Sequence, residues 1–286
     1  MGIVEQIDEK LGRHSREKVS AGVIVKAMIL NGLGFVSAPL YMFSKFFERI
    51  ATEHLLGAGI KAEHITDDRL GNVLNALQEK GLSEIFLSIS LKAVEKYIVN
   101  IETAHLDSSS FHVDGKYENQ GEGSIEITHG YSRDHRPELK QFMMNLIFTG
   151  DGDIPLAMEM VSGNQADKAR FAELLQEFTK QWTFEGICVA DAALYSKENP
   201  EKMVGLKWLT RVPLSIKTAA ELVESTKVLE PSSLKGYNTL ECQSEYGEVK
   251  QRWVLVESAE RRKSDLKKSL QKYNKPRKSA IKSCNH

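Results

Sequence analysis

The chain has 286 residues, of which 41% are hydrophobic and 27% are charged, and its formal net charge is −1. This composition is ordinary for a soluble globular protein of two or more units, and the overall charge identifies no partner. The charge is unevenly distributed, because residues 101–213 carry 11 basic and 18 acidic residues whereas residues 214–286 carry 15 and 9. An acidic middle suits a bound cation and a basic end suits a polyanion, although solvated surface explains both equally well.

Secretion and membrane insertion are disfavoured. The three cysteines lie far apart without the spacing of a metal site, which suits a reducing, cytoplasmic compartment: Cys188, Cys242 and Cys284. The N-terminus MGIVEQIDEK is acidic and lacks the apolar core of a signal peptide. The uncharged run at residues 27–44 reaches membrane length, but turn residues interrupt it. We therefore expect a cytoplasmic protein without a membrane segment.

The first hundred residues carry helical patterns. In the stretch TDDRLGNVLNALQEKG, Thr66 is a suitable cap and Gly81 a suitable stop for a helix. The apolar residues between them recur on one helical face: Leu70, Val73, Leu74 and Leu77. Further helices are expected at residues 18–31 and after Ser83. Such small helical domains often bind DNA, but most do not, so the helices of residues 1–100 are weak evidence of function.

From about residue 101 the pattern changes to that of strands. Alternating or apolar runs predict strands at residues 104–113, 124–132, 140–148 and 154–161. The turn TGDGD joins the last two as a hairpin. A helix with Asp167 as its cap follows, and its apolar face consists of Phe171, Leu174, Leu175 and Phe178. The apolar run GICVAD then predicts a buried strand, which a helical crossover usually returns parallel to a strand already in the sheet.

Two aspartates lie where these strands disfavour a carboxylate. Asp107 interrupts the run ETAHLDSSSFHVDG, and Asp191 ends the run GICVAD. If the crossover brings the two strands side by side, the carboxylates meet, and a cation between them would relieve their repulsion. Mg²⁺ and Mn²⁺ prefer such oxygen ligands and keep waters for a phosphate substrate. The alternative is that each aspartate simply begins a turn.

Several segments together resemble the DDE-type insertion-sequence transposases, and in particular one bacterial branch: HLDSSSFHVDGKY, ITHGYSRDHRPELKQFMMNLI, GDGDIPLAMEMVSGNQADKARFAELLQEF, VADAALYSKEN and GLKWLTRVP. The likeness covers roughly residues 3–256. It implies a ribonuclease-H-like core in which Asp107 and Asp191 correspond to the first two acids of the catalytic triad. It also implies that Mg²⁺ or Mn²⁺ held by these acids activates water or a DNA 3′-hydroxyl. The implied partners are DNA, both element ends and target, and a homo-oligomer is compatible; no nucleotide cofactor is implied.

The third acid of that family, a Glu, often lies in a signature of Tyr, two residues, Arg, three residues, Glu, six residues and Lys. None of the eight tyrosines here is followed by Arg at the third position, so the signature is absent. Glu257 follows a strand-like run and is a poor substitute. The segment from Arg261 to Lys282 holds ten basic residues. A basic helix there either contacts phosphates or is a solvated helix whose packing partner is missing from this sequence. We expect a C-terminally truncated transposase that is inactive by itself.

The segment GYSRDHRPELK gathers four basic side chains within eight residues: Arg133, His135, Arg136 and Lys140. Contact with a DNA backbone is one interpretation, and ion pairing with Asp134 and Glu138 is an equally good one. His105 and His112 flank Asp107, but strand alternation leaves only His105 on its face. Both are therefore expected to be ordinary strand histidines rather than metal ligands.

The expected fold class is α/β (α+β) in three parts. These are a helical N-terminal domain at residues 1–100, a partial ribonuclease-H-like mixed sheet at 101–213, and the start of an inserted β region with a basic C-terminal helix at 214–286. Two other functions stay open: a non-catalytic DNA-binding or dimerising fragment that inhibits intact transposase, and a two-carboxylate hydrolase that needs no metal. Binding of element ends without cleavage would favour the first, and metal-independent activity the second.

Overall fold

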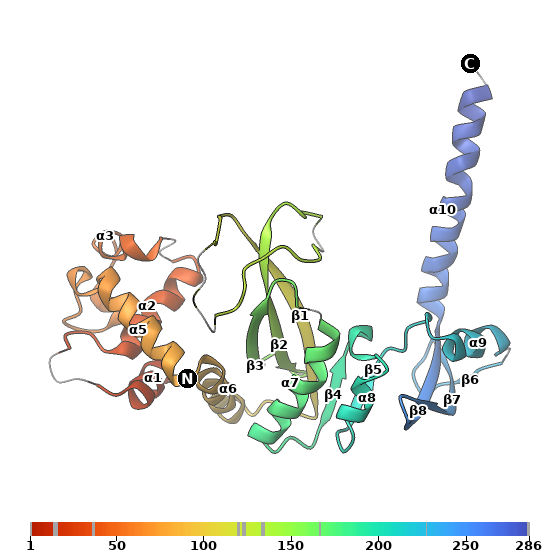
Figure 1. Ribbon diagram of the computed structural model, residues 1–286, viewed down its shortest axis with the longest axis horizontal. Helices are drawn as coiled ribbons and strands as arrows, with labels where there is room; N and C mark the ends of the chain where they lie inside the picture. Colours follow the sequence, from red (N-terminus) through yellow and green to blue (C-terminus); the bar gives the residue numbers. More distant parts are fainter. Residues whose placement is uncertain are drawn as a thin grey trace. The chain divides into compact units, whose positions relative to one another are not determined.

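The computed structural model describes residues 2–13, 17–35, 38–118, 121, 124–132, 135–165, 167–226 and 228–284. The chain is helical as far as Tyr97 and mixed beyond it (Figure 1). The helices and 3₁₀ turns of the first part are α1 (Ile3–Leu11), α2 (Ala21–Gly32), η1 (Leu40–Met42), α3 (Phe43–Phe47), α4 (Thr52–Leu56), η2 (Ala62–His64), α5 (Asp67–Lys80) and α6 (Leu82–Tyr97). Within the described residues, every helix is too short or too polar to cross a bilayer.

Helix α5 begins and ends where the sequence predicts. The Thr66 hydroxyl accepts the Arg69 N–H at 3.2 Å, which satisfies one of the free donors of the first turn, and Gly81 follows the last turn. The predicted apolar face is buried at three positions, with exposed fractions of 7% or less: Leu70, Val73 and Leu77. Leu74 is 41% exposed and is a correction, because the buried stripe of this helix is narrower than the sequence pattern.

Helix α1 was not among the helices predicted from the sequence, and its packing explains why it forms. A Cβ on Gly22 of α2 would lie 2.2 Å from the carbonyl oxygen of Val4, so the two helices cross closely only because residue 22 is glycine. The Gly22 N–H donates to the Asp8 carboxylate at 2.6 Å. Ile7 of α1 is 1% exposed within the apolar core of the N-terminal helices. Contacts with α2 and the core therefore stabilise a helix that is too short to be stable in isolation.

A five-stranded sheet follows, in the order β3-β2-β1-β4-β5. Its strands and intervening helices are β1 (Thr103–Val113), β2 (Lys140–Thr149), β3 (Pro155–Ser162), α7 (Asp167–Gln181), β4 (Ile187–Ala190), η3 (Ala192–Leu194), α8 (Asn199–Lys202) and β5 (Trp208–Thr210). Strand β2 is antiparallel to β1 and β3, whereas β4 is parallel to β1. This order and these directions are those of a ribonuclease-H-like sheet. The predicted parallel return through a helix is confirmed.

The strand predicted at residues 124–132 is wrong. Its described residues make only one bridge to the sheet, between Thr128 and Gln141. Both sides of β2 are already occupied by β1 and β3, so no edge remains there for a further strand. The segment instead lies against the open end of the β2–β3 hairpin, where β2 begins and β3 ends. There a Cβ on Gly130 would lie 2.0 Å from the Gly163 carbonyl oxygen.

Helix α6 packs along the outer strand β3, and the Ser83 hydroxyl donates to the Met158 carbonyl at 3.0 Å. One face of the sheet is dry, with Ala104 and Leu106 of β1 and Ile147 of β2 at most 3% exposed. On α7, the predicted apolar residues Phe171, Leu174, Leu175 and Phe178 are all buried. Asp167, expected as the cap of this helix, is its first residue.

The last part contains α9 (Lys217–Ser225), β6 (Glu230–Pro231), β7 (Tyr237–Tyr246), β8 (Val249–Ser258) and α10 (Ala259–Cys284). Strands β7 and β8 form a hairpin with a two-residue turn, in which Gly247 and Glu248 both have φ of 59°, as a type I′ turn requires. The predicted strand pair and basic helix are confirmed. Two compact units are distinguished: residues 1–167, 177–190 and 207–209, and residues 168–176, 191–206 and 210–286. The domain limits drawn from the sequence stay a prediction.

Candidate active site

Strands β1 and β4 bring two aspartate-bearing segments into register. Four residues of each strand pair in parallel, and the last pair joins Leu106 to Ala190. Asp107 is the next residue of β1, and Asp191 is the next residue after β4. Leu106 and Ala190 are 3% and 8% exposed, whereas both aspartates are exposed. Alternation along each extended segment therefore turns the aspartates away from the dry face.

Asp107 lies in the interior of its strand. Leu146 of β2 is its antiparallel partner on one side. On the other side, the preceding residue Leu106 pairs with Ala190 of β4, so neighbouring strands hold the backbone on both sides. One carboxylate oxygen of Asp107 accepts the N–H of Ser108 at 2.8 Å. The Ser108 side chain is buried on the opposite face, with 1% exposure. The ladder fixes the position of Asp107, and the side chain itself remains open to solvent.

Asp191 lies at a strand end and caps the 3₁₀ turn η3. Its backbone is extended, with φ of −72° and ψ of −178°, and its Oδ1 accepts the Ala193 N–H at 2.8 Å. Its carbonyl oxygen accepts the Thr210 hydroxyl at 2.6 Å and the Leu194 N–H at 3.2 Å. Asp191 therefore does begin a turn, as the simpler interpretation holds, and the same turn fixes the direction of its carboxylate.

The two histidines near Asp107 have partners of their own. His105 stacks on Phe148 with ring centroids 5.6 Å apart, and its Nε2 lies 3.2 Å from the Thr103 hydroxyl. His112 Nε2 lies 3.2 Å from the Ser132 hydroxyl. Across the described residues, no group of three or more His, Cys, Asp or Glu is placed to hold a metal. The available donors are carboxylate oxygens, each partly oriented by a backbone N–H, and these fit a hard divalent cation that keeps waters.

Comparison with known families gives two matches. Residues 101–280, more than half of the chain, match the family described as Transposase DDE domain. The chain belongs to the DDE transposase family. Residues 1–91 match a second family, described as Domain of unknown function (DUF4277). The match of this DDE transposase chain to its family begins just before β1 and includes both aspartates.

Solved transposases resemble the chain at low sequence identity. The Mos1 transposase paired-end complex with left transposon end is 12% identical with a TM-score of 0.26, and covers 65% of this chain and 57% of that one. The Mos1 mariner paired-end complex with Mn is 13% identical with a TM-score of 0.27, with coverages of 72% and 62%. The piggyBac transposase synaptic complex with hairpin DNA is 10% identical with a TM-score of 0.36, with coverages of 90% and 57%. The DDE transposase chain thus spans less than two thirds of these proteins. None of the curated proteins matches it.

The predicted basic cluster lies apart from Asp107 along the sheet. Lys140 pairs with Val113 at the far end of β1, roughly 20 Å from Asp107 at about 3.3 Å per residue. Its ammonium donates to the Lys116 carbonyl. Arg133 and its neighbour Asp134 lie outside the described residues. His135 is exposed and has a positive φ of 58°.

Arg136 takes the ion-pair option that the sequence left open. Its guanidinium donates to Glu138, and both side chains are more than half exposed. The hydrogen bond to Glu138 raises the pKa of Arg136 above its ordinary value, and the same bond lowers the pKa of Glu138. Glu138 occupies the Nε donor of this guanidinium, so a phosphate would bind through the other N–H groups or displace the carboxylate.

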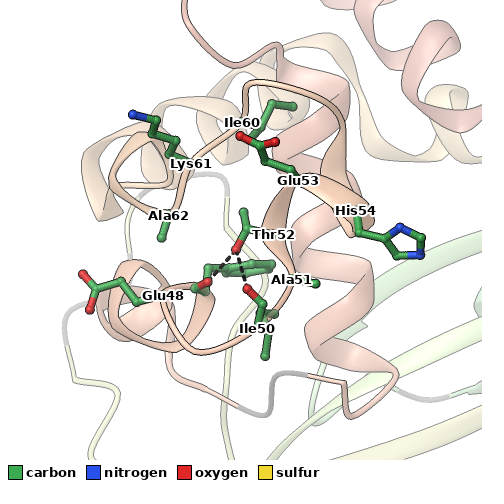
Figure 2. Close-up of a pocket in the computed structure, with 10 residues that line it drawn as sticks. Glu48, Ile50, Ala51, Thr52, Glu53, His54, Ile60, Lys61 and Ala62 are labelled. Atoms are coloured by element: carbon green, nitrogen blue, oxygen red, sulfur yellow. Dashed lines mark hydrogen bonds between the residues drawn. The ribbon is translucent and has the colours of Figure 1, made fainter.

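A pocket of about 370 Å³ lies in the N-terminal helices, remote in sequence from either aspartate (Figure 2). The Thr52 hydroxyl donates to backbone carbonyls at its floor, including that of Ile50 at 3.4 Å. Glu48 and His54 point in different directions in Figure 2. Polar groups do not converge on a common point, so we assign this pocket no ligand.

Proposed function

We propose that this chain carries the metal-binding acids of a DNA transposase, and that Asp107 and Asp191 are two of them. The observation that carries the proposal is the parallel pairing of Leu106 with Ala190, directly before the two aspartates. Equivalent positions on neighbouring parallel strands share a sheet face, so two extended segments would present these carboxylates together. Membership of the DDE transposase family supports the same assignment.

In this proposal Asp107 and Asp191 hold Mg²⁺ or Mn²⁺. A divalent ion bound there would supply activation of water or a hydroxyl as a nucleophile and would stabilise charge on the leaving oxygen. The chain itself orients the two carboxylates. The N–H groups of Ser108 and Ala193 each hold one oxygen, which leaves the other oxygen of each aspartate available to a cation.

The proposed substrates are the DNA ends of a mobile element and a target DNA. Water hydrolyses a phosphodiester at the element end and leaves a 3′-hydroxyl on one side of the break and a 5′-phosphate on the other. The 3′-hydroxyl then attacks a target phosphodiester: the new O–P bond joins element to target as the target's own 3′-O–P bond breaks and a target 3′-hydroxyl leaves. Phosphate contacts by Arg133, His135, Arg136 and Lys140 belong to the proposal, with Arg136 exchanging Glu138 for phosphate. A homo-oligomer and a cytoplasmic location also belong to it, since the free thiols of the described part suit a reducing compartment.

A nicking assay on DNA that carries element ends, with Mn²⁺ or Mg²⁺, tests the function. The missing Tyr–Arg–Glu–Lys signature predicts that this chain alone binds the ends without cutting them. Metal-dependent cleavage that Asp107→Ala abolishes would overturn the predicted inactivity and support the metal pair. Cleavage that persists in Asp107→Ala and Asp191→Ala would contradict the metal pair itself. Asp114→Ala, which removes an exposed aspartate at the end of β1, is the matched control.

A further inference from the structure

A buried cluster joins the β7–β8 hairpin to the segment that follows Asp191. The Tyr195 hydroxyl donates to Gln251 Oε1 at 2.5 Å and accepts the Trp253 indole N–H at 3.1 Å. The Tyr195 ring stacks on Tyr246, with centroids 5.0 Å apart and planes 15° from parallel. Tyr195 and Trp253 are 6% and 7% exposed. Their polar atoms satisfy one another away from water, where an unpaired donor would be costly.

The turn of the hairpin lies against the same segment. Gln251 Nε2 donates to the Tyr246 carbonyl at 3.1 Å and so ties the cluster to the turn. A Cβ on Gly247 would lie 2.4 Å from the Lys197 carbonyl oxygen, two residues beyond Tyr195. Backbone thus meets backbone at this point, which leaves the segment little room to move toward the hairpin.

Only the turn η3 separates Tyr195 from Asp191. The Leu194 side chain between them is fully buried, and its carbonyl accepts the Asn199 amide at 2.9 Å. At the other end, the Thr210 hydroxyl holds the Asp191 carbonyl at 2.6 Å. The segment is therefore anchored at both ends, and few backbone dihedrals remain free between the anchors.

We infer that Tyr195, Gln251 and Trp253 are positioning residues for the carboxylate of Asp191. The inference rests on the proposed role of Asp191 as a metal ligand. The backbone angles of Asp191 and its bond from Ala193 set where the carboxylate points, and both follow the placement of Tyr195. Loss of the Tyr195 hydroxyl leaves the ring in place but removes both hydrogen bonds that tie it to the hairpin, while Trp253 and Gln251 stay bonded to each other at 3.1 Å. The η3 turn then loosens and the carboxylate loses its fixed direction.

The test compares Tyr195→Phe with Tyr237→Phe, the same chemical change on a half-exposed tyrosine at the opposite end of β7. Hydrogen exchange is measured at the amides of Ala193 and Leu194, which donate to Asp191. Mn²⁺ affinity is measured in parallel by titration. In Tyr195→Phe we expect exchange at these two amides to quicken about tenfold and Mn²⁺ to bind about tenfold more weakly, as outer-shell losses commonly cause. Tyr237→Phe should change neither.

Unchanged exchange at Ala193 and Leu194 in Tyr195→Phe overturns the inference, whatever the metal does. Local quickening combined with Mn²⁺ binding that does not depend on Asp107 or Asp191 supports the positioning role and contradicts the proposed function instead. If Tyr195→Phe fails to fold, Trp253→Phe removes the other buried donor and keeps an aromatic ring. Quickening confined to the η3 turn again supports the inference, and uniform quickening across the hairpin and α9 overturns it.

Discussion

The two aspartates are held by different kinds of structure. Asp107 lies within a strand that pairs with a neighbour on each side, so hydrogen bonds of the sheet backbone determine its position. Asp191 lies just beyond a strand of four residues, in a turn that side chains hold. Those side chains come from Thr210 and, through Tyr195, from a hairpin more than fifty residues later in the chain.

This difference teaches that two residues proposed for the same role need not be held equally firmly. The hydrogen bonds of a backbone ladder do not depend on most side chains, whereas a side-chain network is weakened by the loss of a single hydroxyl or indole N–H. We therefore expect substitutions around Asp191 to change metal affinity at little cost to the sheet. Substitutions beneath Asp107 should instead change the stability of the fold.

The largest effect is expected from removal of the aspartates themselves. Asp107→Ala and Asp191→Ala should each weaken Mn²⁺ binding about 100-fold or more, and the double variant should add little, because one cation needs both ligands. Titration monitored by electron paramagnetic resonance measures the three affinities. If the losses of binding free energy in the two single variants add up to that of the double variant, the aspartates belong to two independent sites. The comparison of two ligands of one cation would then not hold.

Gly247→Ala tests the contact between the hairpin turn and the segment after Asp191. The new Cβ meets the Lys197 carbonyl at 2.4 Å and the residue keeps a positive φ, so the unfolding free energy should fall by about 2–3 kcal/mol. Gly236→Ala is the control, because φ there is also positive but nothing lies within 4 Å. It should cost only about 1–2 kcal/mol. Urea unfolding measures both, and equal losses would show that the contact is unimportant.

Thr210→Val removes the hydroxyl that holds the Asp191 carbonyl. We expect Mn²⁺ affinity to fall about fivefold, corresponding to the loss of roughly 1 kcal/mol of hydrogen bonding. Thr226→Val is matched to it, since the Thr226 hydroxyl also donates to a backbone carbonyl at 2.6 Å, that of Leu222. Both variants should lose similar stability, but only Thr210→Val should change the affinity. A change in affinity in both would point to a general loosening of the protein.

The smallest effect concerns the dry face beneath Asp107. Burial raises the pKa of the Cys188 thiol to about 11. The unfolded chain therefore ionises this thiol first as pH rises, and stability is lost between about pH 9 and 11, by about 1 kcal/mol at pH 10. Below pH 8 the ionisation contributes nothing. Denaturant unfolding across this range should show a shallower decline in Cys188→Ala than in the unchanged chain, and parallel declines would indicate that water reaches this face.

Much of the sheet could be predicted from the sequence because its rules are local or topological. Alternation placed Asp107 on the same face of its strand as His105, and the rule that a helical crossover usually returns the chain parallel to a strand of the sheet predicted the parallel neighbour. The strand predicted at residues 124–132 failed for a reason outside its own sequence. Its alternating Ile125 and Ile127 had no free strand edge to pair with, since β2 is already flanked on both sides.

The cluster around Tyr195 could not have been predicted in this way. Tyr195 and Trp253 are separated by 58 positions, and the local sequence around neither residue predicts its hydrogen-bond partner. A buried tyrosine hydroxyl needs a donor or an acceptor, but the sequence does not say which distant residue provides it. The pairing is visible only once β8 places Gln251 and Trp253 on the same side of the hairpin.

The covering of β3 by α6 has a consequence for association between copies of this protein. An open strand edge offers unpaired N–H and carbonyl groups to another chain, and long, flat edges promote aggregation. Here one border of the five-stranded sheet lies beneath a helix, and the other is β5, with three residues. Little backbone is left for a second molecule to extend this sheet, which favours association through side-chain surfaces over strand addition.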